Sequence, residues 1–167
     1  ARQERDLRPA STIDPPIRMP ESTPAAQLPT AIRYTRTKTF FPPPELLEAN
    51  RILGTSSRDP AAAAFRMLRT QVLQRLEEHH WRSVAVFSPR SEDGKTTTAS
   101  NLAIVLALAG RRVLLVDGDL RRPCLHRLYG LPREQGLVQV LTNQLSAAQV
   151  IRRTFVASLD VVTSGPE

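Results

Sequence analysis

The sequence predicts an α/β fold in which a parallel sheet is flanked by helices. Two short apolar runs, VAVF at 84–87 and VLLV at 113–116, have the composition of strands buried on both faces of a sheet. A helical pattern separates them, and a third candidate strand follows at 159–162. Strands that alternate with helices are typical of an open parallel sheet. We expect that sheet to be incomplete at its C-terminal side.

Composition narrows the class of protein. A chain of 167 residues is long enough for one domain with a core. Its net charge of +7 suits nucleotide phosphates, nucleic acid or acidic lipid, but the charge is spread along the chain and no nucleic-acid recognition motif is visible, which argues against nucleic acid. One cysteine cannot form an internal disulfide, which favours a cytoplasmic compartment. The longest apolar run, 102–109, is too short to cross a membrane.

The elements follow in order from the N-terminus. Residues 1–44 hold most of the 14 prolines and predict a disordered, Pro-rich linker. The remainder, 45–167, predicts the folded domain, and its second helix carries an apolar stripe at helical spacing (Phe65, Leu68, Val72, Leu76). The expected order is helices at 45–53 and 59–79, a strand at 84–87, a helix at 95–109, a strand at 113–116, short helices at 123–129, 137–142 and 146–151, and a strand at 159–162.

Segment 88–103, SPRSEDGKTTTASNLA, directly follows the first expected strand and opens a helix. In that context Gly-Lys-Thr predicts a phosphate-binding loop, rather than an ordinary corner with a surface lysine. Gly94 permits a left-handed backbone and close approach of phosphate oxygens. Lys95 supplies charge for the β- and γ-phosphates, the Thr96 hydroxyl is placed to bind Mg²⁺, and we expect Thr97 to reach the α-phosphate. The predicted cofactors are therefore ATP and Mg²⁺.

Two positions depart from the common loop pattern. Pro89 stands five residues before Gly94, where the pattern GxxxxGK[ST] has glycine. Glu92 stands two residues before Gly94, where many such loops have a second glycine. A carboxylate at this position repels a polyphosphate. We expect Glu92 either to point outward or to weaken nucleotide binding.

An acidic motif, Asp117-Gly118-Asp119, follows the run at 113–116. A carboxylate at the C-terminal end of a parallel strand lies where α/β sheets bind ligands. Asp117 and Asp119 can reach a metal shell or orient an attacking hydroxyl from there. The alternative is a solvated turn, for which this tripeptide is suitable chemistry. The position after a buried strand, downstream of the phosphate loop, favours a functional site.

Taken together, these segments resemble the bacterial tyrosine kinases (BY-kinases), within the MinD/ParA-like branch of P-loop NTPases. The resemblance covers roughly residues 59–167 and rests on SxxxxxGKTTTASNLA, GRRVLLVDGDLRRPCLHRLYGL, GLVQVL and LDVVTSGP. It implies a P-loop ATPase domain that transfers phosphate to tyrosine and regulates capsule or exopolysaccharide synthesis and export. The implied partner is a membrane polysaccharide co-polymerase, which would hold this domain at the cytoplasmic face of the inner membrane.

The resemblance also implies roles for individual residues. Lys95 and Thr96 correspond to the Walker A motif of the family, and Asp117 and Asp119 to its Walker A′ pair. Asp117 would activate the acceptor, and Asp119 would support Mg²⁺. Arg66 and Arg69 match two positions of the motif ExxRxxR, which the family uses for ring assembly, and imply self-association through this helix. Ala63 stands where that motif has Glu.

Two alternatives stay open beside the kinase. One is a MinD/ParA-like switch ATPase, which hydrolyses ATP to switch partner binding. Such an ATPase has lysine four residues before Gly94; Arg90 stands there in this sequence and has the charge to imitate that lysine. A non-catalytic adaptor would keep the fold and the partner-binding helix without phosphoryl transfer. The loop residues Pro89 and Glu92, and Ala63 in the second helix, favour the adaptor. We further expect this chain to be a fragment, since no second acidic strand of the family and no tyrosine cluster is present.

Overall fold

The computed structural model describes residues 39–53, 60–90 and 92–166. The predicted linker at 1–44 lies outside the described residues up to position 38. Its last residues contact the folded part: Thr39 forms a β-bridge with Arg153, and the Phe40 amide donates a hydrogen bond to the Arg153 carbonyl oxygen, 2.9 Å away. Pro44 is already the first residue of a helix.

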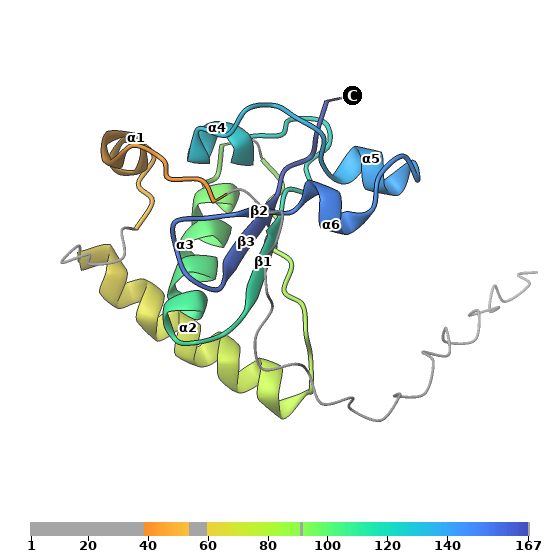
Figure 1. Cartoon of the computed structure of the whole chain (residues 1–167). Coiled ribbons are helices and arrows are strands. Elements are labelled where there is room, and N and C mark those ends of the chain that lie inside the picture. The colour runs from red at the N-terminus through yellow and green to blue at the C-terminus, as the bar shows by residue number, and fades with distance from the viewer. Residues whose placement is uncertain (1–38, 54–59, 91, 167) are drawn as a thin grey trace, which may run out of the picture. The chain divides into compact units, whose positions relative to one another are not determined.

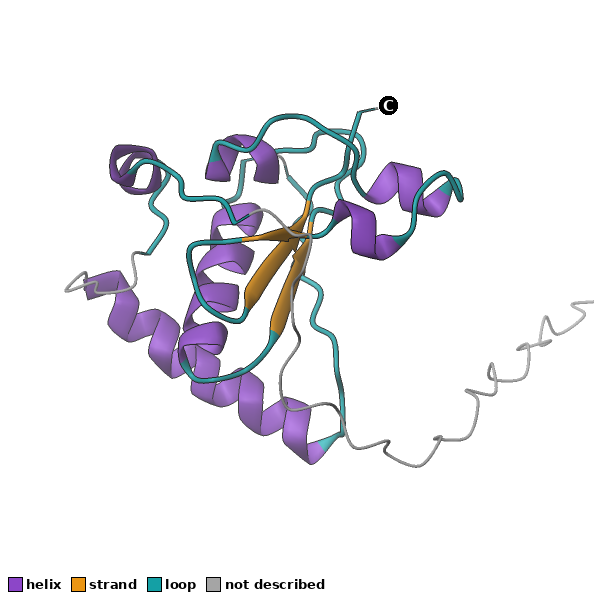
Figure 2. Cartoon of the chain, in the orientation of Figure 1, coloured by secondary structure: helices purple, strands orange, loops and turns teal. Residues whose placement is uncertain are grey.

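The described residues form an α/β arrangement, as the sequence predicted (Figures 1 and 2). Helix α3 lies against the sheet, where it contacts β1 and β3, and α2 packs on α3. The bounds are α1 Pro44–Ala49, α2 Pro60–Glu78, α3 Lys95–Leu108, β1 Val113–Val116, α4 Leu125–Tyr129, α5 Leu137–Leu141, α6 Ala147–Val150, β2 Arg152–Arg153 and β3 Leu159–Val162.

The sheet has the order β1-β3-β2. Strands β1 and β3 are parallel, with Val113 opposite Leu159 and Val116 opposite Val162. These are the runs that the sequence predicted as strands. The sequence did not predict β2, which pairs antiparallel with β3 and makes the sheet mixed. With two residues, β2 is too short to carry a recognisable alternation of apolar and polar side chains.

The main core lies where α3 packs against α2 and the sheet. Ile104 of α3 is fully buried, and Phe65, Leu68 and Val72 of α2 pack against the same cluster, as their helical spacing predicted. Asn101 fixes α3 to the chain after α1: its Oδ1 accepts a hydrogen bond from the Leu53 amide, and its Nδ2 donates one to the Arg51 carbonyl. A second cluster, with Leu125 and Tyr129 at its centre, packs α4 on β3.

The prediction of a buried strand at 84–87 is wrong for this structure. These residues form no ladder and are drawn as a loop in Figure 2. Phe87 is 87% exposed and Val84 is 49% exposed. Residues of this segment and of β1 line the same hollow of about 940 Å³, but the two segments form no β-ladder with each other. Because a strand is held by hydrogen bonds to a neighbour, an apolar run with no such neighbour stays an extended loop.

Candidate nucleotide-binding site

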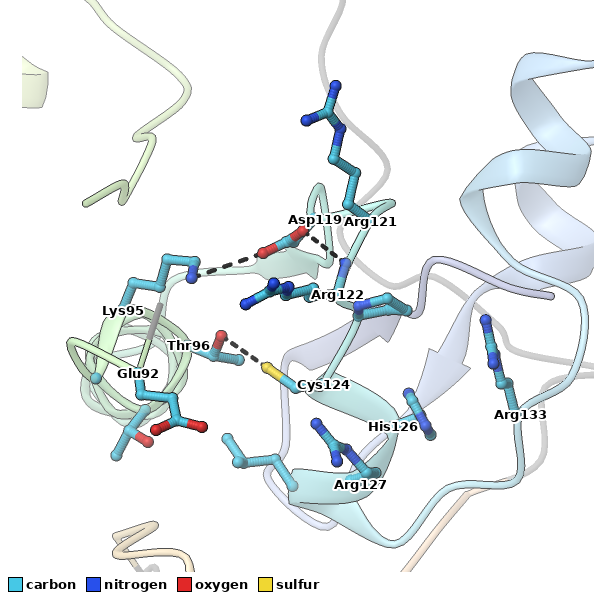
Figure 3. A pocket seen from close by; sticks show the side chains of 14 residues that line it. Glu92, Lys95, Thr96, Asp119, Arg121, Arg122, Cys124, His126, Arg127 and Arg133 are labelled. Carbon is cyan, nitrogen blue, oxygen red and sulfur yellow. Dashed lines mark hydrogen bonds and ion pairs between the residues drawn. The ribbon is translucent and has the colours of Figure 1, made fainter. Parts of the chain in front are cut away.

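A pocket of about 720 Å³ lies over the N-terminus of α3. This volume is within the range of roughly 300–1,000 Å³ that small-molecule sites occupy. Its walls come from the loop before α3, the first turn of α3, the segment after β1, and α4 with the loop that follows it (Figure 3). The lining residues are Glu92, Gly94, Lys95, Thr96, Thr97, Asp119, Arg121, Arg122, Pro123, Cys124, His126, Arg127, Leu128 and Arg133.

The start of α3 has the geometry of an anion site. Gly94 is the N-cap and adopts the left-handed conformation, with φ at 77°, as the sequence predicted. A Cβ placed on Gly94 would meet nothing within 4 Å, so the loop is open on this side. The first amides of a helix have no partner within it and point at whatever lies beyond the N-terminus. Lys95, Thr96 and Thr97 of the first turn all line the pocket.

Glu92 also lines the pocket, and its backbone is left-handed, with φ at 66°. A residue with a Cβ is strained in this region, whereas glycine is not. The backbone conformation at position 92 therefore favours glycine, the residue that many phosphate-binding loops have at this position. The Glu92 side chain is exposed, and Figure 3 shows its carboxylate below Lys95.

Asp119 and Lys95 meet across the pocket. The Asp119 Oδ2 atom lies 3.6 Å from Lys95 Nζ, so the acidic motif and the phosphate loop come together as predicted (Figure 3). The Arg122 backbone N–H donates to Asp119 Oδ1 at 2.9 Å. This hydrogen bond, more than the Lys95 charge, holds the pKa of Asp119 below its usual value of 3.8, against a smaller opposing effect of burial. The carboxylate is therefore ionised at neutral pH.

Asp117 differs from the expectation that it faces the acceptor. It is 6% exposed and does not line the pocket. Its Oδ2 accepts hydrogen bonds from the Cys124 and Leu125 amides, at 3.1 and 2.9 Å, and its Oδ1 accepts one from the Asp119 amide at 3.2 Å. The carboxylate thus caps the start of α4 and fixes the backbone that carries Asp119. An extended strand end would place both carboxylates on one side, but the chain turns after β1.

Cys124 is a site residue that sequence reasoning missed. Its Sγ atom lies 3.0 Å from Thr96 Oγ1, and either atom can be the donor. The sequence analysis used this cysteine only to exclude an internal disulfide, because nothing in the spacing shows that the start of α4 reaches Thr96 in the first turn of α3. Thr96, the predicted Mg²⁺ ligand, thus has a thiol as its neighbour in this structure.

Arg66 and Arg69 of α2 lie apart from this pocket. Arg66 is exposed, and Arg69 is half-buried, with Nη1 3.5 Å from the Val105 carbonyl oxygen of α3. Arg69 therefore lies against the neighbouring helix, which agrees with its place on the apolar stripe. Neither arginine lines the pocket. Their role in self-association stays a prediction.

The residues present fit a magnesium nucleotide. The open left-handed glycine, the free amides of the α3 N-terminus and the Lys95 ammonium suit phosphate oxygens. The Thr96 hydroxyl and the Asp119 carboxylate are hard oxygen donors of the kind that Mg²⁺ binds together with phosphate. No group of three or more His, Cys, Asp or Glu side chains in the described part of the chain is arranged to hold a metal by itself. The donor set therefore suits an ion that arrives with a nucleotide.

Comparisons with known proteins agree with this geometry. Residues 84–158 match the CobQ/CobB/MinD/ParA nucleotide binding domain. The chain is 36% identical over 120 residues to the tyrosine-protein kinase YwqD of Bacillus subtilis (strain 168), which covers 72% of this chain and 51% of YwqD. It is 33% identical over 102 residues to the putative tyrosine-protein kinase CapB of Staphylococcus aureus, which covers 61% of this chain and 45% of CapB. The chain thus spans about half the length of these relatives.

A solved structure shows the same relationship. The kinase domain of the Escherichia coli tyrosine kinase ETK superposes with a TM-score of 0.61 at 28% identity, over 76% of this chain and 54% of that domain. The described helices include none that is long and apolar enough to span a membrane. Residues 84–158 therefore match a nucleotide-binding domain of the CobQ/CobB/MinD/ParA kind, and the chain is similar in sequence and fold to the bacterial tyrosine kinases.

Proposed function

We propose that this chain is the ATP-binding part of a protein-tyrosine kinase that regulates the synthesis or export of a surface polysaccharide. The observation that carries the proposal is the ion pair between Lys95 Nζ and Asp119 Oδ2, which lie 3.6 Å apart. Both residues line the pocket at the N-terminus of α3. The named tyrosine kinases among the homologues support the reaction class. A membrane polysaccharide co-polymerase would be the partner, and it would hold the domain at the cytoplasmic side of the inner membrane.

Each residue has a distinct task in this proposal. Gly94 and the first amides of α3 surround the phosphates, and Lys95 neutralises their charge. Thr96 and Asp119 would hold Mg²⁺, which supplies charge neutralisation and orientation when it is bound. Asp119 stays ionised because the Arg122 amide lowers its pKa. Asp117 acts as a positioning residue, since it fixes both the Asp119 backbone and the start of α4.

The acceptor tyrosine belongs to another segment or another molecule. Tyr129 is 1% exposed, and burial raises its pKa to about 12. A hydroxyl that is closed off from solvent and difficult to ionise is a poor nucleophile. The other tyrosine of the sequence, Tyr34, lies outside the described residues. Self-association through Arg66 and Arg69 would bring such an acceptor from a second copy.

The first experiment is a titration of ADP with Mg²⁺ into the whole chain by calorimetry, with circular dichroism to show that each variant is folded. We expect binding at micromolar strength that is lost in Lys95→Ala. The matched control is Arg75→Ala, which removes one positive charge from the exposed face of α2, where Arg75 pairs with Glu78. Absence of binding to the folded wild type would overturn the proposal and leave a non-catalytic adaptor.

A second experiment separates the kinase from a switch ATPase, which the CobQ/CobB/MinD/ParA match also supports. The chain is incubated with γ-labelled ATP and a tyrosine-containing peptide. Label on tyrosine supports the kinase. Free labelled phosphate without labelled peptide, lost in Lys95→Ala, supports the switch ATPase.

A further inference from the structure

The pocket has two chemically different ends. The α3 end carries Gly94, Lys95 and Thr96, which suit phosphates. The other end is formed by α4 and the loop after it, and there Arg127 and Arg133 line the wall. Figure 3 shows Lys95 on one side, Asp119 in the middle, and Arg133 on the far side.

Among the described residues, no carboxylate forms an ion pair with the arginines of this pocket. Arg121, Arg122, Arg127 and Arg133 all line the pocket, and none of them has an ion-pair partner within 4.0 Å among the described residues. By contrast, Arg152, near the same loop, pairs with Glu134 at 3.2 Å. A concave site with uncompensated charge of one sign concentrates ligands of the opposite sign.

The pKa of His126, which also lines the pocket, is affected by burial and by two of these arginines. Burial lowers its pKa below the usual 6.5, and the charges of Arg127 and Arg133 lower it further, while Asp117 has a smaller opposite effect. Both guanidinium groups therefore act on the same imidazole, which stays neutral at pH 7. The two arginines face one region of the pocket, not separate parts of the surface.

The nucleotide phosphates already have a place at the α3 end under the proposed function. An attacking hydroxyl must approach the last phosphate in line with the bond that breaks, from the side away from the leaving group. Asp119 lies beside Lys95, and Arg133 lies farther along the pocket, beyond α4 (Figure 3). The chain that brings the acceptor hydroxyl therefore passes over Asp119 and along the arginine end.

We propose that Arg127 and Arg133, with Arg121 and Arg122 beside them, form an acceptor subsite that selects tyrosines flanked by anionic side chains. Guanidinium groups bind carboxylates and phosphates through paired hydrogen bonds, so either glutamate or phosphotyrosine next to the acceptor has the required chemistry. The inference rests on the proposed function, because it takes the ligand of this end to be the acceptor polypeptide.

The test measures peptide binding to the whole chain by fluorescence anisotropy, with ADP and Mg²⁺ present. The labelled probes share one central tyrosine, flanked by glutamate, by phosphotyrosine, by glutamine or by lysine. We expect the glutamate and phosphotyrosine peptides to bind best and the lysine peptide worst. Arg127 and Arg133 are both exposed, so each single substitution, Arg127→Ala or Arg133→Ala, should weaken binding of the anionic peptides about twofold to fivefold, the range for an exposed ion pair.

Controls distinguish this subsite from simpler explanations. Arg75→Ala on α2 should leave peptide binding unchanged, and glutamine-peptide binding should not respond to any of the substitutions. Equal affinity for glutamate and glutamine peptides would overturn the proposal. So would equal loss of affinity in Arg75→Ala, or arginine-dependent binding of single-stranded DNA that matches the anionic peptides.

Nucleotide binding is measured separately on the same variants. If Arg127→Ala and Arg133→Ala weaken ADP binding as much as peptide binding, the arginines serve the nucleotide and the acceptor subsite is wrong. If the wild type binds ADP but does not discriminate among peptides, the subsite fails while the proposed function stands. If the wild type discriminates among peptides without binding ADP, the arginine end is an anionic-peptide site and the proposed function fails.

Discussion

Replacing Glu92 tests how the unusual loop affects both stability and nucleotide binding. Glu92 lines the pocket and has a left-handed backbone, with φ at 66°. Glu92→Gly removes the strain and the charge together. Glu92→Gln is the matched control, because it keeps a side chain of the same size and the same strained backbone, and removes only the charge.

The two effects have different expected magnitudes. A left-handed residue with a Cβ costs about 1–2 kcal/mol, and glycine loses about 0.5–1 kcal/mol more than other residues through chain entropy. Glu92→Gly should therefore raise the free energy of unfolding by about 0.5–1 kcal/mol, which corresponds to a Tm increase of roughly 1–4 °C for a domain of this size. Glu92→Gln should leave Tm unchanged.

Affinity responds to the charge, not to the strain. Because the Glu92 side chain is exposed, solvent and salt screen its repulsion of phosphate, and its removal should strengthen ADP binding by at most about 1 kcal/mol, or roughly fivefold. Both variants should gain equally, and the gain should shrink as salt rises. Calorimetry with ADP and Mg²⁺ measures the affinity, and thermal unfolding by circular dichroism measures Tm.

Two results would refute this reasoning. Weaker ADP binding in Glu92→Gln would show that the carboxylate helps to hold the magnesium nucleotide. Equal Tm increases in Glu92→Gln and Glu92→Gly would show that charge, and not backbone strain, limits the stability of the loop.

Three further predictions follow from buried and ionised groups. Asn101→Ala should lower the free energy of unfolding by about 1–3 kcal/mol, measured by urea denaturation, because it leaves the buried Leu53 amide without its acceptor; a change below 0.5 kcal/mol would contradict this. Tyr129→Phe should be neutral or stabilising in the same assay, since the buried Tyr129 hydroxyl forms no hydrogen bond of ordinary geometry and has only a weak interaction with the Ser100 side chain; a clear loss of stability would show that the contact with Ser100 is a stabilising hydrogen bond. Asp119 has a lowered pKa in the folded chain, so its contribution to stability is present above pH 3.8 and is lost as pH falls through the lowered value. Asp119→Asn should remove that part of the acid sensitivity in thermal unfolding as pH falls below 3.8, and an unchanged pH profile would argue against it.

Local patterns in the sequence were sufficient for the helices and for two strands. The stripe of Phe65, Leu68 and Val72 identified the packed face of α2, and VLLV identified β1. The phosphate loop was also readable, because Gly94 and Lys95 act through the backbone turn in which they stand. These features depend on residues close in the chain, so a short window contains their cause.

Pairing between strands that are far apart in the chain cannot be predicted from such a short window. The run at 84–87 has strand composition, but it forms no ladder among the described residues, because a strand also requires a neighbour at the right place. The short strand β2 exists only because β3 offers its free edge. Neither fact can be read from the composition of the segment concerned.

The division is clearest at the site. The sequence by itself determined which groups bring charge and hydroxyls to the phosphate loop, since Lys95, Thr96 and the acidic motif are recognisable as residue types at set spacings. Only the tertiary structure decided that Asp119 faces Lys95 while Asp117 caps α4, and that Cys124 reaches Thr96. The physical reason is that the turn after β1, and the packing of α4 on the sheet, set the direction of each side chain, and these depend on contacts between segments far apart in the chain.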